Sequence, residues 1–253
     1  MKENLSALAG RNLRGLKVNT YPGRGIVVGK DLSGENIVQV YWIMGRSFNS
    51  RNRVFCSDVS GRVWTEAADP AKVTDPSLII YTAMREGGGL YVVSNGVQTD
   101  TAFEFMGGGQ YDSFHKAMHL HQYEPDQPNF TPRISAACSL RPGNITAEMA
   151  ILKKSPWEDG CDRYFYSFPI VHNGIGLCLT TYDGQGDPLP AFSRRPYPLP
   201  FYEDPEKDYG IADVADMYWQ VLNEENRVSL AVKFINLEST RSQVKIINKF
   251  SKA

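Results

Sequence analysis

The sequence between residues 133 and 182 reads as a series of strands: RISAACSL at 133–140, AEMAILK at 147–153, YFYSFPIV at 164–171 and GLCLTTY at 176–182. Several of these segments have apolar or aromatic residues at successive positions, and therefore on both faces of the strand. A strand buried on both faces belongs to a layered arrangement, with a sheet on one side and a sheet or a helix on the other. This region therefore predicts stacked sheets.

The rest of the chain extends this pattern. We expect further strands at 25–29, 36–44, 54–56, 77–84, 90–94 and 228–235, and helices near 99–107, 113–121 and 211–222. About ten strands, with helices in the middle and late in the chain, predict an α+β protein whose antiparallel sheets stack and whose helices cover the outer faces. Residues 1–20 are expected to form an N-terminal extension and residues 21–253 a single domain, closed by a basic tail.

Composition excludes several classes of partner. The 253 residues are 42% hydrophobic, which is enough for a substantial core, and the net charge is −1. Broad electrostatic binding to nucleic acid or to an anionic membrane needs an excess of Lys and Arg. We therefore expect no nucleic-acid or membrane partner, and any phosphate-bearing ligand must be held by a local cluster.

The four cysteines, at 56, 138, 161 and 178, are scattered and form no C-x-x-C pair. They are expected to be buried thiols in a reducing compartment, without zinc. Residues 1–14 lack the long apolar core of a signal peptide or a membrane span, so the expected location is the cytoplasm. His115 and His119 lie one helical turn apart, but a third ligand is missing, so a half-exposed helix face is favoured over a metal site.

The connection GRSFNSRNR at 45–53 concentrates arginines in a stretch without a carboxylate; no acid occurs between Glu35 and Asp58. Strands are expected on both sides, which would hold the connection rigidly. Guanidinium groups match phosphate and carboxylate oxygens, so an anion site and a solvated turn are both consistent with the pattern. Arg53 is expected to point away on the following strand.

No nucleophile–base–acid set, G-x-S-x-G elbow or H-E-x-x-H motif occurs in the chain. What remains is Arg, Tyr, Glu and backbone N–H groups, which suit the binding of a phosphorylated small molecule and proton transfer without cofactor, metal or covalent intermediate. The proline-rich connection 183–209 is expected to be an ordered covering flap, with a plain linker as the alternative.

Several segments in order along residues 22 to 195 resemble the archaeal-type IMP cyclohydrolase family. They are Gly23–Gly29, Arg46–Phe48 with Arg51, Ile80–Thr82 with Arg85, Val92–Gly96 with Thr99 and Asp100, Tyr123–Glu124 with Asp126, Thr131–Ile134, and Gly186–Pro190 with Phe192. The resemblance implies a four-layer αββα sandwich similar to N-terminal-nucleophile hydrolases without their nucleophile. It also implies a homo-oligomeric hydrolase of purine biosynthesis that closes 5-formamidoimidazole-4-carboxamide ribonucleotide to IMP and water.

The resemblance also implies roles for single residues. Arg46 and then Arg51 are expected to bind the 5′-phosphate, with Arg46 also counted as catalytic. Tyr81 is expected to donate to the formyl oxygen and Glu124 to receive the amide proton; a half-buried core tyrosine and a helix-end carboxylate are the alternatives. The remaining expected substrate contacts are Asn95 and Gly96, otherwise only a turn, and Arg133, otherwise paired with a neighbouring acid.

The chain departs from the family pattern at Gly45, Asn49 and Ser50, and Gln98 stands where His is common. These changes are consistent with a branch that acts on a related ribonucleotide. They leave two alternatives open: a non-catalytic purine-nucleotide-binding paralogue, and an amidohydrolase on the same fold.

Overall fold

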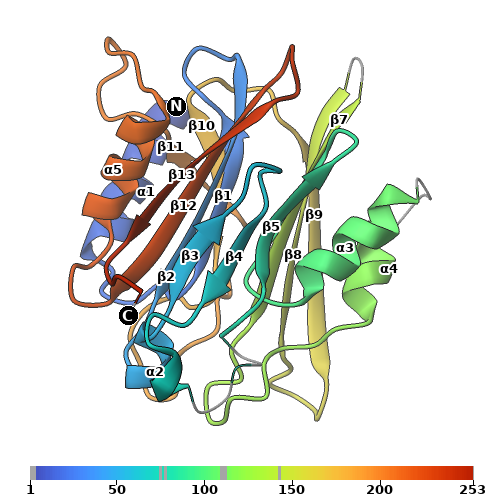
Figure 1. Ribbon diagram of the computed structural model, residues 1–253, viewed down its shortest axis with the longest axis vertical. Helices are drawn as coiled ribbons and strands as arrows, with labels where there is room; N and C mark the ends of the chain where they lie inside the picture. Colours follow the sequence, from blue (N-terminus) through green and yellow to red (C-terminus); the bar gives the residue numbers. More distant parts are fainter. Residues whose placement is uncertain (1–3, 74–75, 77–78, 109–112, 142–143, 253) are drawn as a thin grey trace.

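The computed structural model describes residues 4–73, 76, 79–108, 113–141 and 144–252, and it contains two antiparallel sheets (Figure 1). The six-stranded sheet has the order β11 (Tyr197–Pro200), β10 (Ile175–Thr180), β1 (Gly25–Lys30), β2 (Asn36–Met44), β12 (Arg227–Asn236) and β13 (Ser242–Asn248). The seven-stranded sheet has the order β3 (Val54–Ser57), β4 (Val63–Glu66), β5 (Thr82–Gly87), β6 (Leu90–Ser94), β7 (Arg133–Arg141), β8 (Asn144–Lys154) and β9 (Cys161–Pro169).

Helices cover the outer face of each sheet. Helices α1 (Leu5–Val18) and α5 (Ile211–Val221) pack on the six-stranded sheet, and α3 (Gln98–Gly107) and α4 (Ser113–His119) pack on the seven-stranded sheet. The largest apolar cluster lies between the two sheets. Figure 1 shows these four layers side by side, and the predicted αββα arrangement of stacked antiparallel sheets is confirmed.

Strand β2 shows why the sequence folds in this way. Its nine residues, NIVQVYWIM, are buried almost throughout. Val38, Val40 and Trp42 face the helix side, whereas Tyr41 and its neighbours at alternate positions face the second sheet. Because successive side chains of a strand point to opposite faces, a continuous apolar run fits a strand covered on both sides.

The N-terminal segment forms α1, which buries Ala9, Leu13 and Leu16. Other segments differ from the expectations. The expected basic tail contains strand β13, and β4 occurs at Val63–Glu66, where no strand was expected. Within the expected strand 77–84, β5 begins only at Thr82, and residues 77–78 lie outside the described part of the chain.

Strand ends from both sheets meet at one end of the sandwich. In the six-stranded sheet, the register pairs Gly25 with Trp42 and with Thr180, so β1 begins where β2 and β10 end. In the seven-stranded sheet, β3, β5 and β7 begin near the end of β6. The connection from β2 to β3, which contains the short helix α2 (Phe48–Arg51), crosses from one sheet to the other at this end (bottom of Figure 1).

The cysteines are free thiols: Cys138 and Cys178 are buried, while Cys56 and Cys161 are only partly buried. Burial raises the pKa of the Cys138 and Cys178 thiols to about 12, so both stay protonated at neutral pH. Of the helices in the described ranges, none has the length and apolarity needed to cross a membrane.

Candidate active site

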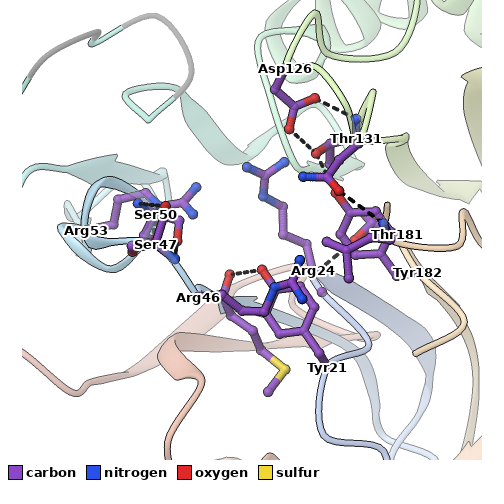
Figure 2. Close-up of a pocket in the computed structure, with 14 residues that line it drawn as sticks. Tyr21, Arg24, Arg46, Ser47, Ser50, Arg53, Asp126, Thr131, Thr181 and Tyr182 are labelled. Carbon is purple, nitrogen blue, oxygen red and sulfur yellow. Dashed lines mark hydrogen bonds between the residues drawn. The ribbon is translucent and has the colours of Figure 1, made fainter. Parts of the chain in front are cut away.

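A cavity of about 190 Å³ opens at the end of the sandwich where the two sheets meet (Figure 2). Its walls come from the start of β1, the β2–β3 connection, the end of β10 and the loop that precedes β7. The lining residues are Tyr21, Gly23, Arg24, Met44, Arg46, Ser47, Ser50, Arg53, Asp126, Asn129, Thr131, Thr181, Tyr182 and Leu189. Three arginines and a single carboxylate line it, so the cavity favours an anionic ligand.

Two glycines set the position of Arg24. Gly23 has a φ of 72°, and a Cβ atom there would lie 2.1 Å from Thr181 Oγ1. A Cβ atom at Gly25 would lie 1.9 Å from the ring of Trp42. The backbone can approach these side chains only because both positions lack a side chain. The Arg24 backbone N–H donates to Thr181 Oγ1 at 3.1 Å, and the guanidinium enters the space between the sheets.

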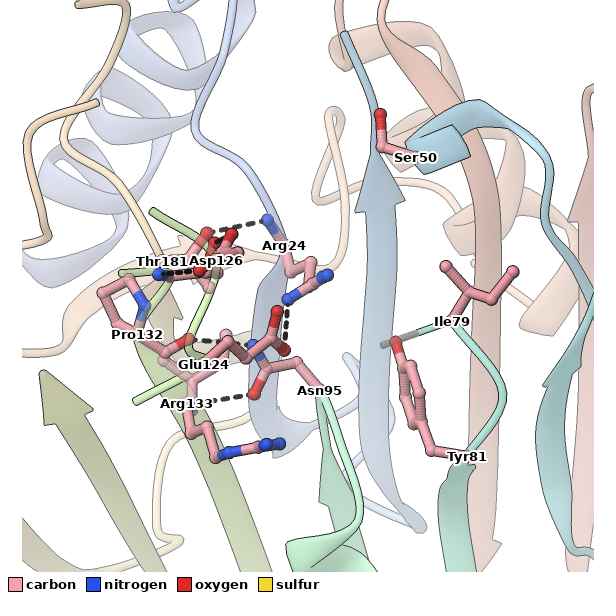
Figure 3. A network of polar contacts seen from close by, with 12 residues as sticks. Arg24, Ser50, Ile79, Tyr81, Asn95, Glu124, Asp126, Pro132, Arg133 and Thr181 are labelled. Carbon is pink, nitrogen blue, oxygen red and sulfur yellow. Dashed lines mark hydrogen bonds and ion pairs between the residues drawn. The ribbon is translucent and has the colours of Figure 1, made fainter. Parts of the chain in front are cut away.

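Arg24 forms a buried ion pair with Glu124 (Figure 3). Arg24 Nη1 lies 2.7 Å from Glu124 Oε1, and Glu124 is 3% exposed. Burial by itself lowers the pKa of Arg24, but the charge of Glu124 holds this pKa well above its ordinary value. The carboxylate expected from the sequence therefore lies in direct contact with a guanidinium that lines the cavity.

Arg53 also lines the cavity, and the expectation that it points away is wrong. It is 1% exposed, and its Nε donates to Ser50 O at 2.9 Å. Within the described part of the chain, its Nη1 is buried and has no hydrogen-bond partner. Burial, and next the charge of Arg24, lowers the pKa of Arg53. A buried charge without a partner is costly unless a ligand neutralises it.

Several hydrogen bonds hold the connection that contains Arg53. Ser47 and Ser50 form reciprocal caps of α2: Ser47 Oγ accepts from Ser50 N at 3.1 Å, and Ser50 Oγ accepts from Ser47 N at 3.0 Å. Asn52 is fixed to Asp69 through hydrogen bonds of 2.7 and 2.8 Å. Ser50, one of the departures from the family pattern, fits the local structure because its hydroxyl accepts from Ser47 N and donates to Ser47 O. Its backbone carbonyl accepts from Arg53 Nε.

The other two arginines of this connection have different surroundings. Arg46 lies at the cavity mouth, where its guanidinium covers the ring of Tyr21 at 4.9 Å and Nη1 donates to Gln185 Oε1 at 3.2 Å. This contact, together with one from Nη1 to Gly186 O at 3.4 Å, joins the arginine connection to the proline-rich segment. Arg51 is not among the cavity residues; its Nε donates to Gly45 O at 2.9 Å and its Nη2 to Asn226 Oδ1 at 3.3 Å.

Tyr81 directly precedes β5 and is not among the residues that line the cavity. It is 6% exposed, and its hydroxyl is 2.6 Å from the hydroxyl of Tyr41 on β2. Both tyrosines are close enough to Arg24 and Arg53 to affect the pKa values of the two guanidinium groups. In Figure 3, Tyr81 and Arg24 reach into the same space from opposite sides.

Asn95, Gly96 and Arg133 form a framework beside Glu124 rather than lining the cavity. Asn95 is fully buried and its side chain bonds to Pro132 O and Ile134 N, so its polar atoms tie the end of β6 to β7. A Cβ atom at Gly96 would lie 2.1 Å from Arg133 Nη1, so glycine leaves room for that guanidinium.

Gln98 takes part in the same framework. Its Oε1 accepts from Arg133 Nη1 at 3.0 Å, and its Nε2 donates to Asn95 Oδ1 at 3.1 Å. Gln98 is fully buried at the start of α3. The residue that departs from the family pattern therefore orients one arginine of the site and leaves its charge unneutralised.

Another wall of the cavity consists of Asp126, Thr131 and Tyr182. None of these three residues was expected in the site. Asp126 accepts from the backbone N–H of Thr131 at 2.6 Å and from its hydroxyl, and Thr131 Oγ1 lies 2.6 Å from Tyr182 Oη. Burial raises the pKa of Tyr182, so its hydroxyl stays protonated. Asp126 and Thr131 could have been predicted from the sequence as neighbours of the site, because both follow Glu124 closely in the chain.

His115 and His119 lie away from the cavity, and both rings pack against Phe165. His115 Nδ1 is 3.9 Å from Glu148 Oε1. Among the described residues, no group of three His, Cys, Asp or Glu side chains is arranged to hold a metal ion.

The sequence was also compared with those of known proteins. The family model described as "IMP cyclohydrolase-like protein" matches residues 21–240. An IMP cyclohydrolase from Methanothrix thermoacetophila is 34% identical over 123 residues, which are 48% of this chain and 59% of the relative. The aligned part thus spans well under two thirds of that relative's length.

Proposed function

The chain belongs to the IMP cyclohydrolase-like family, and from this premise we propose that it catalyses ring closure of 5-formamidoimidazole-4-carboxamide ribonucleotide to IMP and water. The observation that supports the proposal most is the charge of the cavity: Arg53 is buried near Arg24, and its Nη1 has no hydrogen-bond partner among the described residues. A phosphorylated ligand would supply the missing anion. The same proposal includes a role in purine biosynthesis, a cytoplasmic location and a homo-oligomeric state.

The proposed orientation places the 5′-phosphate against Arg53, with Arg46 at the mouth. Ser47 and Ser50 also line this part of the cavity. Arg51 has a different role in this proposal, because it holds the connection in shape through Gly45 O and Asn226. Charge-assisted hydrogen bonds to a phosphate are each worth about 1.5 to 3 kcal/mol when well formed.

The reacting groups would then lie deeper, between Glu124 and Tyr81. The carboxamide nitrogen attacks the formyl carbon and loses a proton, for which Glu124 is the proposed acceptor. Tyr81 donates a proton to the formyl oxygen, which gives a carbinol. The formamide nitrogen then loses its proton, which restores Tyr81, and the C=N bond forms as the carbon–oxygen bond breaks. Glu124 returns its proton to the departing hydroxyl, which leaves as water. Because both reacting groups belong to one molecule, holding them in contact supplies much of the rate, and the buried donors stabilise the developing oxyanion.

Arg24 is proposed to keep Glu124 correctly oriented. The 2.7 Å contact fixes the position of the carboxylate that is to accept the proton. Arg133, held by Gln98, adds a second positive charge near Glu124. The proposed substrate contacts of Asn95 and Gly96 then become indirect, because both residues fix the position of Arg133.

The test is the ultraviolet change that accompanies ring closure, followed with the full-length protein and the formylated carboxamide ribonucleotide. We expect turnover by the native protein and at least a roughly 100-fold lower kcat for Tyr81→Phe. The matched control is Tyr91→Phe, since the Tyr91 hydroxyl bonds to Thr240 O away from the cavity.

The competing function is a non-catalytic purine-nucleotide-binding protein, which the replacement of His by Gln98 motivates. Absence of turnover by the native protein together with retained IMP binding would support this second function and reject ring closure. Absence of both turnover and IMP binding would reject both functions, and release of ammonia from an amide substrate would support an amidohydrolase.

A further inference from the structure

Tyr41 and Tyr81 form a hydroxyl pair that joins the two sheets. Tyr41 belongs to β2 of the six-stranded sheet, whereas Tyr81 directly precedes β5 of the seven-stranded sheet. Their hydroxyl oxygens are 2.6 Å apart, which is a short hydrogen bond between neutral groups. Tyr41 is fully buried, and its ring packs against Phe55 at 5.4 Å.

The surroundings decide which hydroxyl donates in this pair. A buried tyrosine hydroxyl needs an acceptor for its proton, because an unsatisfied buried donor costs about 1 to 3 kcal/mol. Among the residues that the structure describes, Tyr81 Oη is the hydrogen-bond partner of Tyr41 Oη. If Tyr81 donated to Tyr41, the proton of Tyr41 would remain buried without an acceptor.

The protonation state of Tyr41 agrees with this direction. Burial, and next the neighbouring Tyr81, raises the pKa of Tyr41 well above its ordinary value. Tyr41 therefore keeps its proton over the whole neutral range and remains a donor. Tyr81 is 6% exposed, whereas Tyr41 is fully buried, so Tyr81 is the member of the pair that a ligand can approach.

We infer that Tyr41 is a positioning residue: it donates to Tyr81 Oη and so leaves the proton of Tyr81 free to be donated to the ligand. This inference rests on the proposed ring closure, in which Tyr81 donates to the formyl oxygen. Donation by Tyr41 also polarises the Tyr81 hydroxyl and strengthens it as a donor, since linked hydrogen bonds reinforce one another. Tyr41 itself touches no reacting atom.

The pair also explains why the site needs both sheets. Tyr41 is fixed within the central strand β2, which is hydrogen-bonded on both sides, by β1 and by β12. Tyr81 is held by Thr65, whose hydroxyl accepts from the Tyr81 backbone N–H at 3.0 Å. The 2.6 Å contact therefore fixes the position of the Tyr81 hydroxyl. Arg24 enters the same space from β1 (Figure 3).

The first experiment uses carbon-13 labelling of the tyrosine Cζ atoms in the full-length protein, because this resonance reports hydrogen bonding at the hydroxyl. The Tyr81 signal is assigned from Tyr81→Phe. We expect Tyr41→Phe to move the Tyr81 signal and Tyr91→Phe to leave it in place. Tyr91 is a suitable control since it is buried, and its hydroxyl donates to Thr240 O at 2.7 Å.

The second experiment compares kcat with KM for the same variants. Tyr41→Phe should lower kcat by roughly 10- to 100-fold, because the Tyr81 hydroxyl is then less well oriented and less polarised. This loss is smaller than the whole contribution of a general acid. KM should stay within about threefold, because Tyr41 makes no ligand contact. Thermal melting of each variant separates loss of activity from loss of folding.

The outcomes distinguish this inference from the proposed function. A Tyr81 signal that does not move in Tyr41→Phe contradicts the hydrogen-bond direction, whether or not the protein turns over. A kcat that is unchanged in Tyr41→Phe, or equally reduced in Tyr91→Phe, shows a merely structural role. Absence of turnover by the native protein would reject ring closure. The carbon-13 signal of Tyr81 would still test the direction of the hydrogen bond between Tyr41 and Tyr81.

Discussion

Arg53 is a buried guanidinium whose hydrogen bonds are only partly satisfied within the described part of the chain. Its Nη1 is buried and has no hydrogen-bond partner among the described residues, and burial together with Arg24 lowers its pKa. Such a group destabilises the unliganded fold, and a residue of this kind is expected where function requires it. We therefore expect Arg53 to destabilise the unliganded fold and to favour binding of the proposed phosphate.

Replacement of Arg53 should separate these two effects. Arg53→Met keeps much of the side-chain volume and removes the unpaired charge, so Tm should stay the same or rise. KM for the formylated ribonucleotide should rise roughly 10- to 100-fold, since about 1.5 to 3 kcal/mol of charge-assisted bonding is lost. Calorimetry and steady-state kinetics measure the two quantities.

Arg51→Met is the matched control for this experiment. Arg51 belongs to the same connection but is absent from the cavity lining, and it bonds to Gly45 O and Asn226 Oδ1. The Arg51→Met substitution should lower Tm. Its effect on KM should be smaller than that of Arg53→Met. Equal KM values for the native protein and Arg53→Met would show that Arg53 does not bind the substrate.

His121 gives the pH dependence of stability a defined direction. Burial, and next the charge of Arg133, lowers the pKa of His121 below its ordinary value of 6.5. The folded state therefore disfavours the protonated ring. Stability should be fully present above pH 6.5 and decrease as the pH falls below it, because the unfolded chain takes up the proton first.

Chemical denaturation at several pH values measures this effect, with His121→Gln as the comparison. Between pH 6.5 and pH 5, the free energy of unfolding should decrease less in His121→Gln than in the native protein. Identical slopes for the native protein and His121→Gln would contradict the prediction. His115→Gln serves as a control, since that ring packs against Phe165 on the outer face of the second sheet.

At the residue scale, the sequence predicted part of the site. Arg46 lines the cavity, and Tyr81 and Glu124 both lie near Arg24, from segments recognised by their resemblance to the family. Arg24 and Arg53 were missed as site residues. Whether a guanidinium is buried or solvated depends on how two sheets meet, and neither charge nor spacing along the chain contains that information.

At the scale of elements, strand β1 depends on glycines. A Cβ atom at Gly25 would lie 1.9 Å from the ring of Trp42, whereas nothing lies within 4 Å of a Cβ atom at Gly15 in α1. The same substitution should therefore have opposite effects at the two positions. Gly15→Ala should stabilise by about 0.5 to 1 kcal/mol, as expected in a helix interior.

Gly25→Ala should destabilise by about 3 kcal/mol or more, because Trp42 is fully buried and has little room to move. It should also raise KM, since the substitution displaces the adjacent Arg24. Denaturant unfolding of both variants is the measurement. A Gly25→Ala protein as stable as the native protein would mean that β1 and Trp42 pack less closely than the structure shows.

Element type was predictable where periodicity was strong. Strand β2 was expected at its observed bounds, 36–44, because both of its faces are apolar. Strands β4 and β13 were missed, since their short alternating patterns with charged residues resemble exposed loops. Their partners, β5 and β12, supply the hydrogen bonds that make them strands, and such pairing is tertiary information.

At the scale of the whole molecule, the two sheets share one core. The central cluster draws residues from both sheets, and the Tyr41–Tyr81 contact and a buried pair, Lys233 with Glu86, also join them. We propose that residues 21–253 form one domain, with α1 of the N-terminal segment as an added outer cover. Unfolding should then occur in one cooperative transition.

Differential scanning calorimetry can measure this cooperativity. The calorimetric and van't Hoff enthalpies should agree for a single domain with a shared core. Two resolved transitions, or a calorimetric enthalpy well above the van't Hoff value, would show that the two sheets unfold separately. The four layers themselves were predictable, because strands with two apolar faces require a cover on each side.

The most direct test of the account is the rate of IMP formation by three proteins: native, Glu124→Gln and Glu104→Gln. Glu124 is 3% exposed and paired with Arg24, whereas Glu104 is an exposed residue of α3 near Arg85. We predict turnover by the native protein and Glu104→Gln, and a kcat lower by at least roughly 100-fold in a folded Glu124→Gln protein. Equal rates for Glu124→Gln and the native protein, or no IMP formed by the native protein, would contradict it.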